Sequence, residues 1–372
     1  MGFHIVKRDN CPLWKRCCLY LAAVLAALAV GAVMLWALGV NPFKYFFQMF
    51  TLGTVKNRIA YKTFMNYLDM FIPLVLTSVA LSLAFKMRFW NIGGEGQFIM
   101  GAIAAATVAF KLGPVLPTWL TLIVMCLAAM LLAGLYGLIV AALKVRFGTN
   151  ETLLTLMLNY IALYAVTFLG ETKADWNFFL QEESARPIFK NFLDIAAFPY
   201  IPIGKNFKLN ICVILTFIIG ALIYIYLKRT KQGYEISVVG DSMGTAKYAG
   251  MKVNRVILRT VFLSAALIGL AAAFKISSNT SGALSTSITD DVGWTGIIVA
   301  WLAKLNTPMI FIVSALICVL QYGSIVANAT FAQVDSSFAN MLQGLILFLV
   351  LVADFYTRFR LVRNKKGAEN NG

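Results

Sequence analysis

The amino-acid sequence predicts an all-α membrane protein that crosses the bilayer about ten times. Hydrophobic residues make up 60% of the 372 residues and charged residues 13%, whereas a soluble domain has about 45–50% apolar and about 25% charged residues. Several apolar stretches approach the roughly 20 residues that an α-helix needs to cross the hydrocarbon core. One water-soluble body cannot bury so much apolar surface, so lipid is the predicted solvent.

The apolar runs define the predicted helices. The first one follows a basic stretch, but it is longer than the roughly 7–15 apolar residues of a signal peptide. We therefore expect an uncleaved first helix. The run at 96–112 follows a glycine-rich turn, and the run at 292–303 is short. Both features favour broken or tilted helices. The ten runs lie at 17–40, 71–87, 96–112, 119–142, 152–170, 210–227, 258–275, 292–303, 308–328 and 338–357.

Basic residues between the runs predict the orientation. Most of the 32 lysines and arginines fall in segments that share one side of the membrane, and cytoplasmic loops attract basic residues. With both termini inside, the predicted organisation is a cytoplasmic tail at 1–16, a membrane domain at 17–357, external segments at 41–70 and 171–209, cytoplasmic loops at 143–150 and 228–258, and a cytoplasmic basic tail at 358–372. This arrangement also explains the net charge of +16. No zinc-finger spacing, basic helix or RNA-binding signature points to nucleic acid.

The external segment 41–70 carries basic residues and a group of aromatic residues. This mixture favours an amphipathic helix on the outer surface of the membrane. The side chains predicted to face lipid are those of Phe43, Tyr45, Phe46, Phe47 and Phe50.

A short internal repeat is visible in the membrane domain. Ala84-Phe85-Lys86 ends one apolar run and Ala273-Phe274-Lys275 ends another, and a turn rich in Gly, Asn or Ser follows each. The two units would have opposite orientations in the bilayer. This arrangement is typical of transporters built from inverted repeats.

A glycine-rich segment between two apolar runs predicts a turn within the membrane or at its edge. Irregular backbone is tolerated there only where protein or water satisfies its polar groups. Glu95 has two interpretations, because it could accept backbone hydrogen bonds in a structural hinge or couple an ion to transport. The residues of this predicted re-entrant or gating turn are Asn91, Gly93, Gly94, Glu95, Gly96 and Gln97.

Two further segments suggest a translocation path. Asn150 precedes an apolar run and suits a helix N-cap, while Asn159 and Tyr160 place polar groups within that run. Trp294 lies in the glycine-interrupted start of the short run at 292–303, and such a segment points to a transport pathway. We predict that Asn150, Asn159, Tyr160 and Trp294 line this path.

The longest predicted cytoplasmic loop contains a short helix. Residues 240–251 suit two helical turns, with Asp241 or Ser242 as the cap and Gly250 at the end. Small side chains on one face leave room for a docking partner. The residues predicted to contact that partner are Gly240, Asp241, Ser242, Gly244, Ala246, Ala249 and Gly250.

Features of catalytic and cofactor-binding proteins are missing from the sequence. There is no phosphate-binding G-x-x-x-x-G-K-[ST] loop, and the only histidine, His4, lies in the N-terminal tail. The six cysteines are scattered through or beside apolar runs. This distribution indicates that they are small apolar residues that pack between helices. We therefore expect no catalytic residues, no metal and no bound cofactor.

Taken together, these motifs resemble the permease subunits of ribose/nucleoside-type bacterial ABC importers, and the form of the first motif is similar to the nucleoside branch. The resemblance extends over about residues 70–357. The motifs are Asn-Ile-Gly-x-Glu-Gly-Gln at 91–97, Gly-Thr-Asn-Glu at 148–151 with Leu-Met-Leu-Asn-Tyr at 156–160, Gly-Tyr-Glu at 233–235 with Val-Gly at 239–240 and Ala-x-x-x-Gly at 246–250, and Gly-Trp-Thr-Gly-Ile-Ile-Val-Ala-Trp-Leu at 293–302.

The resemblance implies a type II importer fold in the bacterial cell membrane. It implies a second permease, a cytoplasmic ABC ATPase that hydrolyses the ATP, and an external substrate-binding lipoprotein. The 240–251 helix would then be the coupling helix that docks on the ATPase. The alternative is an ion-coupled secondary transporter, for which Glu95 is the best-placed carboxylate.

Overall fold

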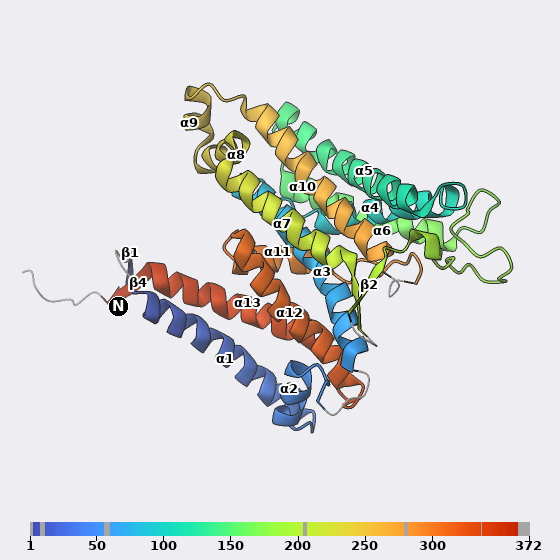
Figure 1. Cartoon of the computed structure of the whole chain (residues 1–372). Coiled ribbons are helices and arrows are strands. Elements are labelled where there is room, and N and C mark those ends of the chain that lie inside the picture. Colours follow the sequence, from blue (N-terminus) through green and yellow to red (C-terminus); the bar gives the residue numbers. More distant parts are fainter. Residues whose placement is uncertain are drawn as a thin grey trace, which may run out of the picture. The chain divides into compact units, whose positions relative to one another are not determined.

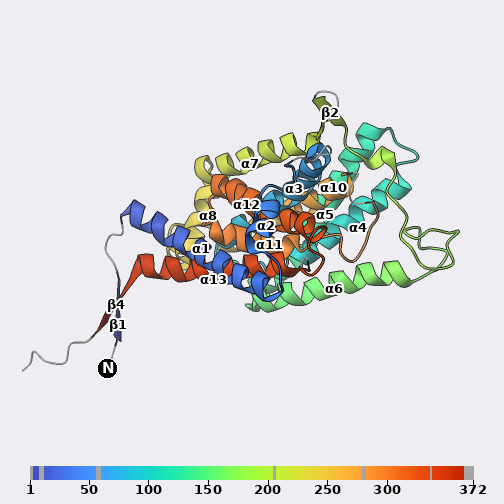
Figure 2. The same ribbon diagram turned by 90° about the horizontal axis from the view of Figure 1, so that it is seen from below.

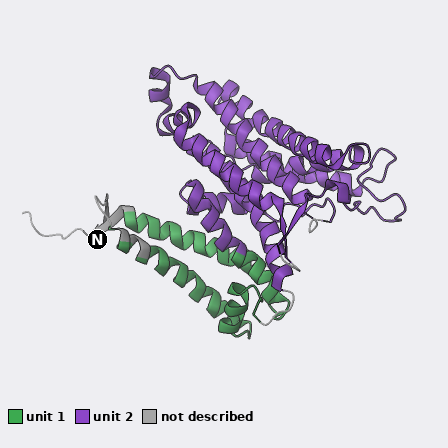
Figure 3. Cartoon of the chain, viewed as in Figure 1, with its two compact units in different colours: residues 1–57, 319–372 green, residues 58–318 purple. Residues whose placement is uncertain are grey.

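The computed structural model describes residues 3–7, 12–55, 60–203, 207–278, 282–335 and 337–363, and it divides into two compact units. Unit 1 combines Met1–Asn57 with Val319–Gly372, and unit 2 is Arg58–Cys318 (Figure 3). The helix α12 (Thr307–Asn328) runs from unit 2 into unit 1. The rest of the predicted tails, at 1–2, 8–11 and 364–372, lies outside the described residues.

In unit 1, two long helices lie side by side. The helix α1 (Leu13–Ala37) packs along α13 (Ser337–Arg358), and a Cβ atom at Gly31 would lie 3.1 Å from Leu342. The chain ends form antiparallel strands, β1 (Phe3–Lys7) and β4 (Phe359–Arg363). The sequence analysis treated these residues only as tails. Their pairing brings both ends of the chain to the same side of unit 1 (Figure 1).

A short helix, α2 (Pro42–Phe50), follows α1 and confirms a helix in the predicted external segment. Asn41 caps it by accepting hydrogen bonds from the backbone N–H groups of Phe43 and Lys44. The predicted lipid-facing set was wrong at Tyr45. This side chain is fully buried and its hydroxyl lies 2.7 Å from that of Ser324, because a buried phenol needs a polar partner.

Unit 2 contains the membrane core and the candidate site. Its elements are α3 (Ala60–Lys86), α4 (Gly94–Lys111), α5 (Thr118–Phe147), α6 (Glu151–Glu171), the 3-10 helix η1 (Asp194–Ala196), β2 (Tyr200–Ile203), β3 (Phe207–Asn210), α7 (Ile211–Arg229), α8 (Lys231–Asp241), α9 (Met243–Tyr248), α10 (Val253–Ile276), α11 (Val292–Leu302) and the first part of α12. β2 and β3 pair as a hairpin. The helix α3 begins at Ala60, so residues 60–70 of the predicted external segment are helical.

The helices α3 and α10 form the centre of unit 2, with α4 and α5 packed against α10. Small residues allow this close approach. A Cβ atom at Gly101 would lie 2.7 Å from the Cα atom of Gly269, and one at Gly269 would lie 2.2 Å from the carbonyl oxygen of Ala129. The Ser264 hydroxyl also donates to the carbonyl of Ala80, linking α10 to α3 over 2.7 Å. Small residues and interhelical hydrogen bonds are the expected means of helix packing in lipid.

Every predicted apolar run contains a helix, which confirms the all-α prediction. In the described part of the chain, eight helices are long and apolar enough to cross a membrane, and α11 is a shorter apolar helix. The proposed repeat units correspond to α3–α4 and α10–α11. Their connections differ in length, at 87–93 and 277–291, so the inverted repeat remains a prediction.

The two ends of unit 2 carry different connections. The helices α8 and α9 lie at one end, and the segment at 172–203 with strand β2 lies at the other (Figures 1 and 2). The helix α7 runs from the hairpin β2–β3 towards α8. The side of the membrane that each end faces stays a prediction.

Candidate functional site

The predicted re-entrant turn is a buried polar network between α3 and α4. Asn91 and Gln97 form two reciprocal hydrogen bonds between their side-chain amides, each 3.1 Å long, and both residues are buried. The Oδ1 atom of Asn91 also accepts from the N–H group of Gly93, at 3.1 Å. The irregular backbone is thus satisfied by protein groups, as the membrane interior requires.

Asn159 connects this turn to α6. Its Oδ1 atom accepts from the N–H group of Gly96 at 2.8 Å, and its Nδ2 atom donates to the carbonyl of Ile92 at 2.9 Å. A Cβ atom at Gly96 would lie only 3.0 Å from the Cα atom of Asn159. The glycine therefore allows α4 and α6 to approach closely enough for both hydrogen bonds.

Glu95 joins the beginnings of two helices. It lies in the first turn of α4, and its Oε2 atom accepts a 2.8 Å hydrogen bond from the N–H group of Gly293 at the start of α11. Thr289 and Trp294 line the same cavity as this carboxylate. A carboxylate stabilises the positive N-terminal end of a helix. The position therefore supports the structural role that was one of the two interpretations of Glu95.

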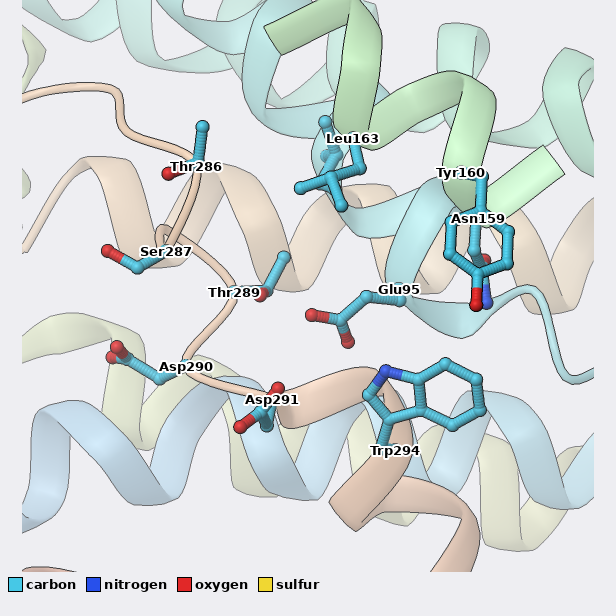
Figure 4. Close-up of a pocket in the computed structure, with 11 residues that line it drawn as sticks. Glu95, Asn159, Tyr160, Leu163, Thr286, Ser287, Thr289, Asp290, Asp291 and Trp294 are labelled. Atoms are coloured by element: carbon cyan, nitrogen blue, oxygen red, sulfur yellow. The ribbon is translucent and has the colours of Figure 1, made fainter. Parts of the chain in front are cut away.

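A cavity of about 570 Å³ lies beside Glu95 (Figure 4). This volume is within the range of small-molecule binding sites. The helix α4 contributes Glu95 and Ile99, α6 contributes Asn159, Tyr160 and Leu163, and α11 contributes Trp294. The segment before α11 contributes the remainder. The residues from that segment are Thr286, Ser287, Thr289, Asp290 and Asp291.

The lining of the cavity is acidic, polar and aromatic. Glu95, Asp290 and Asp291 carry carboxylates, and no lining residue is basic. Lys275 binds Asp290 in an ion pair of 2.8 Å at one edge. The side chains of Tyr160 and Trp294 are 52% and 39% exposed. The cavity therefore offers aromatic faces and hydrogen-bond acceptors to a solute.

Three of the four predicted path residues line this cavity, and the fourth lies elsewhere. Asn159, Tyr160 and Trp294 belong to the lining, whereas Asn150 caps α6 by accepting hydrogen bonds from Thr152 and Leu153. The sequence analysis did not assign the acidic residues before the short run to a site. Only folding shows that the segment at 286–291 lies against α4 and α6.

The predicted coupling segment forms two helices instead of one. Asp241 ends α8, and Ser242 caps α9 by accepting a hydrogen bond from the N–H group of Thr245, so Ser242 is the cap. Gly250 follows α9 with a φ of +75°. Because an L side chain is strained in this conformation, the glycine suits the end of the helix.

Two residues of the predicted docking face are buried within the chain itself, which corrects that prediction. Ala246 has no exposed surface, because α9 packs this residue inward. A Cβ atom at Gly240 would lie 2.0 Å from the carbonyl oxygen of Lys86, so this glycine serves the packing of α8 on α3. Asp241, Ser242, Gly244, Ala249 and Gly250 are exposed, as is Tyr248 beside them.

Among the described residues, no three His, Cys, Asp or Glu side chains are placed to hold a metal ion. Cys212 and Cys318 are free and buried, and Cys126 is partly buried. The site that the structure brings together is therefore the cavity beside Glu95.

Comparison with known proteins relates the fold to a transport family. The family model of the branched-chain amino acid transport system, permease component, matches residues 63–351. A glucose ABC transporter permease protein of Haloferax volcanii is 28% identical, with 95% of this chain and 92% of that protein covered. A nucleoside ABC transporter permease protein of Lactococcus lactis is 28% identical, with 82% of each chain covered. A guanosine ABC transporter permease protein of Bacillus subtilis is 26% identical, over 80% of this chain and 83% of that protein.

Proposed function

This chain belongs to the family of permease components of the branched-chain amino acid transport system, and from this premise we propose that it imports nucleosides. It is the multi-pass membrane permease subunit of an ABC importer and has no ATPase site of its own. Such a permease works with a separate ATPase and a substrate-binding partner. Family membership decides against the alternative of an ion-coupled secondary transporter.

The observation that supports a nucleoside is the lining of the cavity beside Glu95. Trp294 and Tyr160 offer aromatic faces on which a base can stack. The carboxylate of Asp291 can accept hydrogen bonds from ribose hydroxyl groups. Two of the relatives named above carry nucleosides or guanosine in their names.

A simple sugar is the second candidate, because another relative is named as a glucose permease. Carboxylates and hydroxyl groups would suit the hydroxyl groups of a sugar equally well. The exposed rings of Tyr160 and Trp294 are the feature that favours a solute with an aromatic base.

We propose the rest of the assembly from the same premise. Two permease subunits surround the translocation path. They are either two copies of this chain or this chain and a related one. A binding lipoprotein delivers the solute outside, and the ATPase docks on the exposed part of α8 and α9. Both termini, with the loops at 143–150 and 228–258, face the cytoplasm, and the chain holds no cofactor.

Substrate-stimulated ATP hydrolysis tests the proposal. The assembled transporter would be reconstituted in liposomes with its binding protein, and hydrolysis and uptake would be measured with uridine, guanosine, ribose and glucose. We expect the nucleosides to stimulate both processes and the sugars to leave them at the basal level. Stimulation by ribose or glucose alone would assign the protein to sugar transport.

A further inference from the structure

The cavity beside Glu95 has an uneven charge that bears on which solutes it admits. Its wall contains three carboxylates, those of Glu95, Asp290 and Asp291, and no lysine, arginine or histidine. A solute that carries negative charge would be repelled by every ionised group in this wall. A neutral solute would not be repelled, and the carboxylates could accept hydrogen bonds from its donors.

The three carboxylates differ in their partners. Glu95 accepts the N–H group of Gly293, and Asp290 forms an ion pair with Lys275. The structure shows no ion pair for Asp291 in the described part of the chain. Asp291 is exposed and immediately precedes α11, the helix that contributes Trp294.

The backbone at this position makes the choice of side chain informative. Asp290 and Asp291 adopt left-handed conformations, with φ of +45° and +56°. Glycine would adopt them without steric cost. Aspartate is one of the few other residues that adopt this conformation readily, and the two aspartates here place carboxylates at the cavity. The close-up shows the side chain of Asp291 beside the cavity, between those of Asp290 and Trp294 (Figure 4).

We infer that Asp291 makes the cavity selective for nucleosides over nucleotides, by repelling the phosphate group at the place where the base stacks on Trp294 and Tyr160. This inference rests on the proposed nucleoside transport and adds a residue that determines specificity. A phosphate monoester carries about −1.5 to −2 charges at neutral pH. Like charges brought together in this way act against the wrong ligand.

Protection of an engineered thiol tests the inference directly at the cavity. Thr286→Cys would be introduced into the assembled permease–ATPase complex after replacement of the six native cysteines, since Thr286 is exposed and lines the cavity. The rate of labelling by N-ethylmaleimide, a neutral reagent, would be measured with increasing uridine or uridine monophosphate. The concentration that halves the rate reports occupancy of the cavity, whichever solutes the binding protein would deliver.

In this background we expect uridine to protect the thiol. The concentration of uridine monophosphate that halves the labelling rate should be at least about tenfold higher than that of uridine, which corresponds to a difference in binding free energy of about 1.4 kcal/mol. Adding Asp291→Asn should reduce the difference between the two concentrations, because it removes one charge and keeps a similar shape. Glu183→Gln, an exposed acid in the segment at 171–209, is the matched control and should leave the difference unchanged.

Equal protection by both ligands in the Thr286→Cys background would overturn the inference, as would a difference that Asp291→Asn does not reduce. Absence of protection by uridine would also overturn it, because the cavity would then not hold the solute. The uptake assay distinguishes failure of the inference about Asp291 from failure of the proposed nucleoside transport. Uridine uptake without protection refutes only the inference, whereas loss of both refutes the nucleoside proposal as well.

Discussion

Glu95 holds the first turn of α11 through its hydrogen bond with the Gly293 N–H group, and this contact can be tested by a substitution that preserves the acceptor. We predict that Glu95→Gln retains most of the transport rate, because the amide oxygen can replace the carboxylate oxygen. Glu95→Ala should lose most of it, since an unpaired buried N–H group costs about 1–3 kcal/mol. Nucleoside uptake and the melting temperature of the purified complex measure both effects.

The opposite pattern would contradict the structural role of Glu95. Complete loss of transport in a Glu95→Gln protein that assembles and melts normally would mean that the charge itself is needed. Uptake measured at several pH values would then show whether transport depends on the ionisation of Glu95.

Sequence reasoning at the residue scale identified the glycine-rich turn but not its partners. The types and spacing of Asn91 to Gln97 indicated an irregular, satisfied backbone. They could not indicate that Asn91 would pair with Gln97, or that Asn159 would bridge Gly96 and Ile92. The contacts of Asn159 depend on how α4 and α6 pack, and side chains from separate helices carry no mutual spacing in the sequence. The Asn91–Gln97 pair is local, but it depends on the exact path of the turn.

Among the elements, α9 shows why the docking prediction needed correction. The small residues of its sequence indicated a close contact, but the contact made by Ala246 is with the chain itself. We therefore predict that Ala246→Glu destabilises the packing of the α8–α9 segment, because burying an unpaired carboxylate costs several kcal/mol. Limited proteolysis of this segment should become faster in the isolated permease, before any ATPase is added. Unchanged proteolysis would contradict the buried position.

Tyr248 is the better probe of the ATPase contact. Its side chain is 96% exposed at the end of α9, and exposed aromatic residues often dominate the energy of an interface. We predict that Tyr248→Ala weakens ATPase binding about tenfold or more and leaves the melting temperature of the permease unchanged. Co-purification and titration of the ATPase measure the effect. Trp119→Ala, an exposed aromatic at the start of α5, is the control and should bind the ATPase normally.

The packing of α10 on α5 gives a further prediction at the scale of elements. A methyl group at Gly269 would overlap the carbonyl oxygen of Ala129 at 2.2 Å. Forcing extra volume into such a contact costs about 1–3 kcal/mol. Gly269→Ala should therefore lower the melting temperature of the permease, whereas Gly344→Ala, which has no neighbouring atom within 4 Å, should not. Equal melting temperatures would show that the helices can separate without cost.

Across the whole molecule, hydropathy was a reliable guide to the existence of helices. Each apolar run contains a helix because backbone groups in lipid must be satisfied within their own segment. The ends of helices were less predictable. The helix α3 begins at Ala60, well before its apolar run, and the pairing of β1 with β4 joins segments that the sequence places at opposite ends of the chain. Neither feature depends on hydrophobicity, so the apolar pattern could not indicate it.

The arrangement of unit 2 leads to a prediction for the orientation of the entire chain. The segment at 172–203 and the helices α8 and α9 lie at opposite ends of this unit (Figure 1). Most basic residues lie in the segments predicted to share a side with α8 and α9, and cytoplasmic loops are enriched in such residues.

We predict that a thiol introduced by Lys190→Cys reacts with a membrane-impermeant maleimide from outside intact cells. A thiol introduced by Lys247→Cys, exposed on α9, should react only after the cells are opened. Both variants would be made without the native cysteines. Labelling of the position-190 thiol only from the inner face would reverse the topology and place the docking segment outside the cell, away from any ATPase.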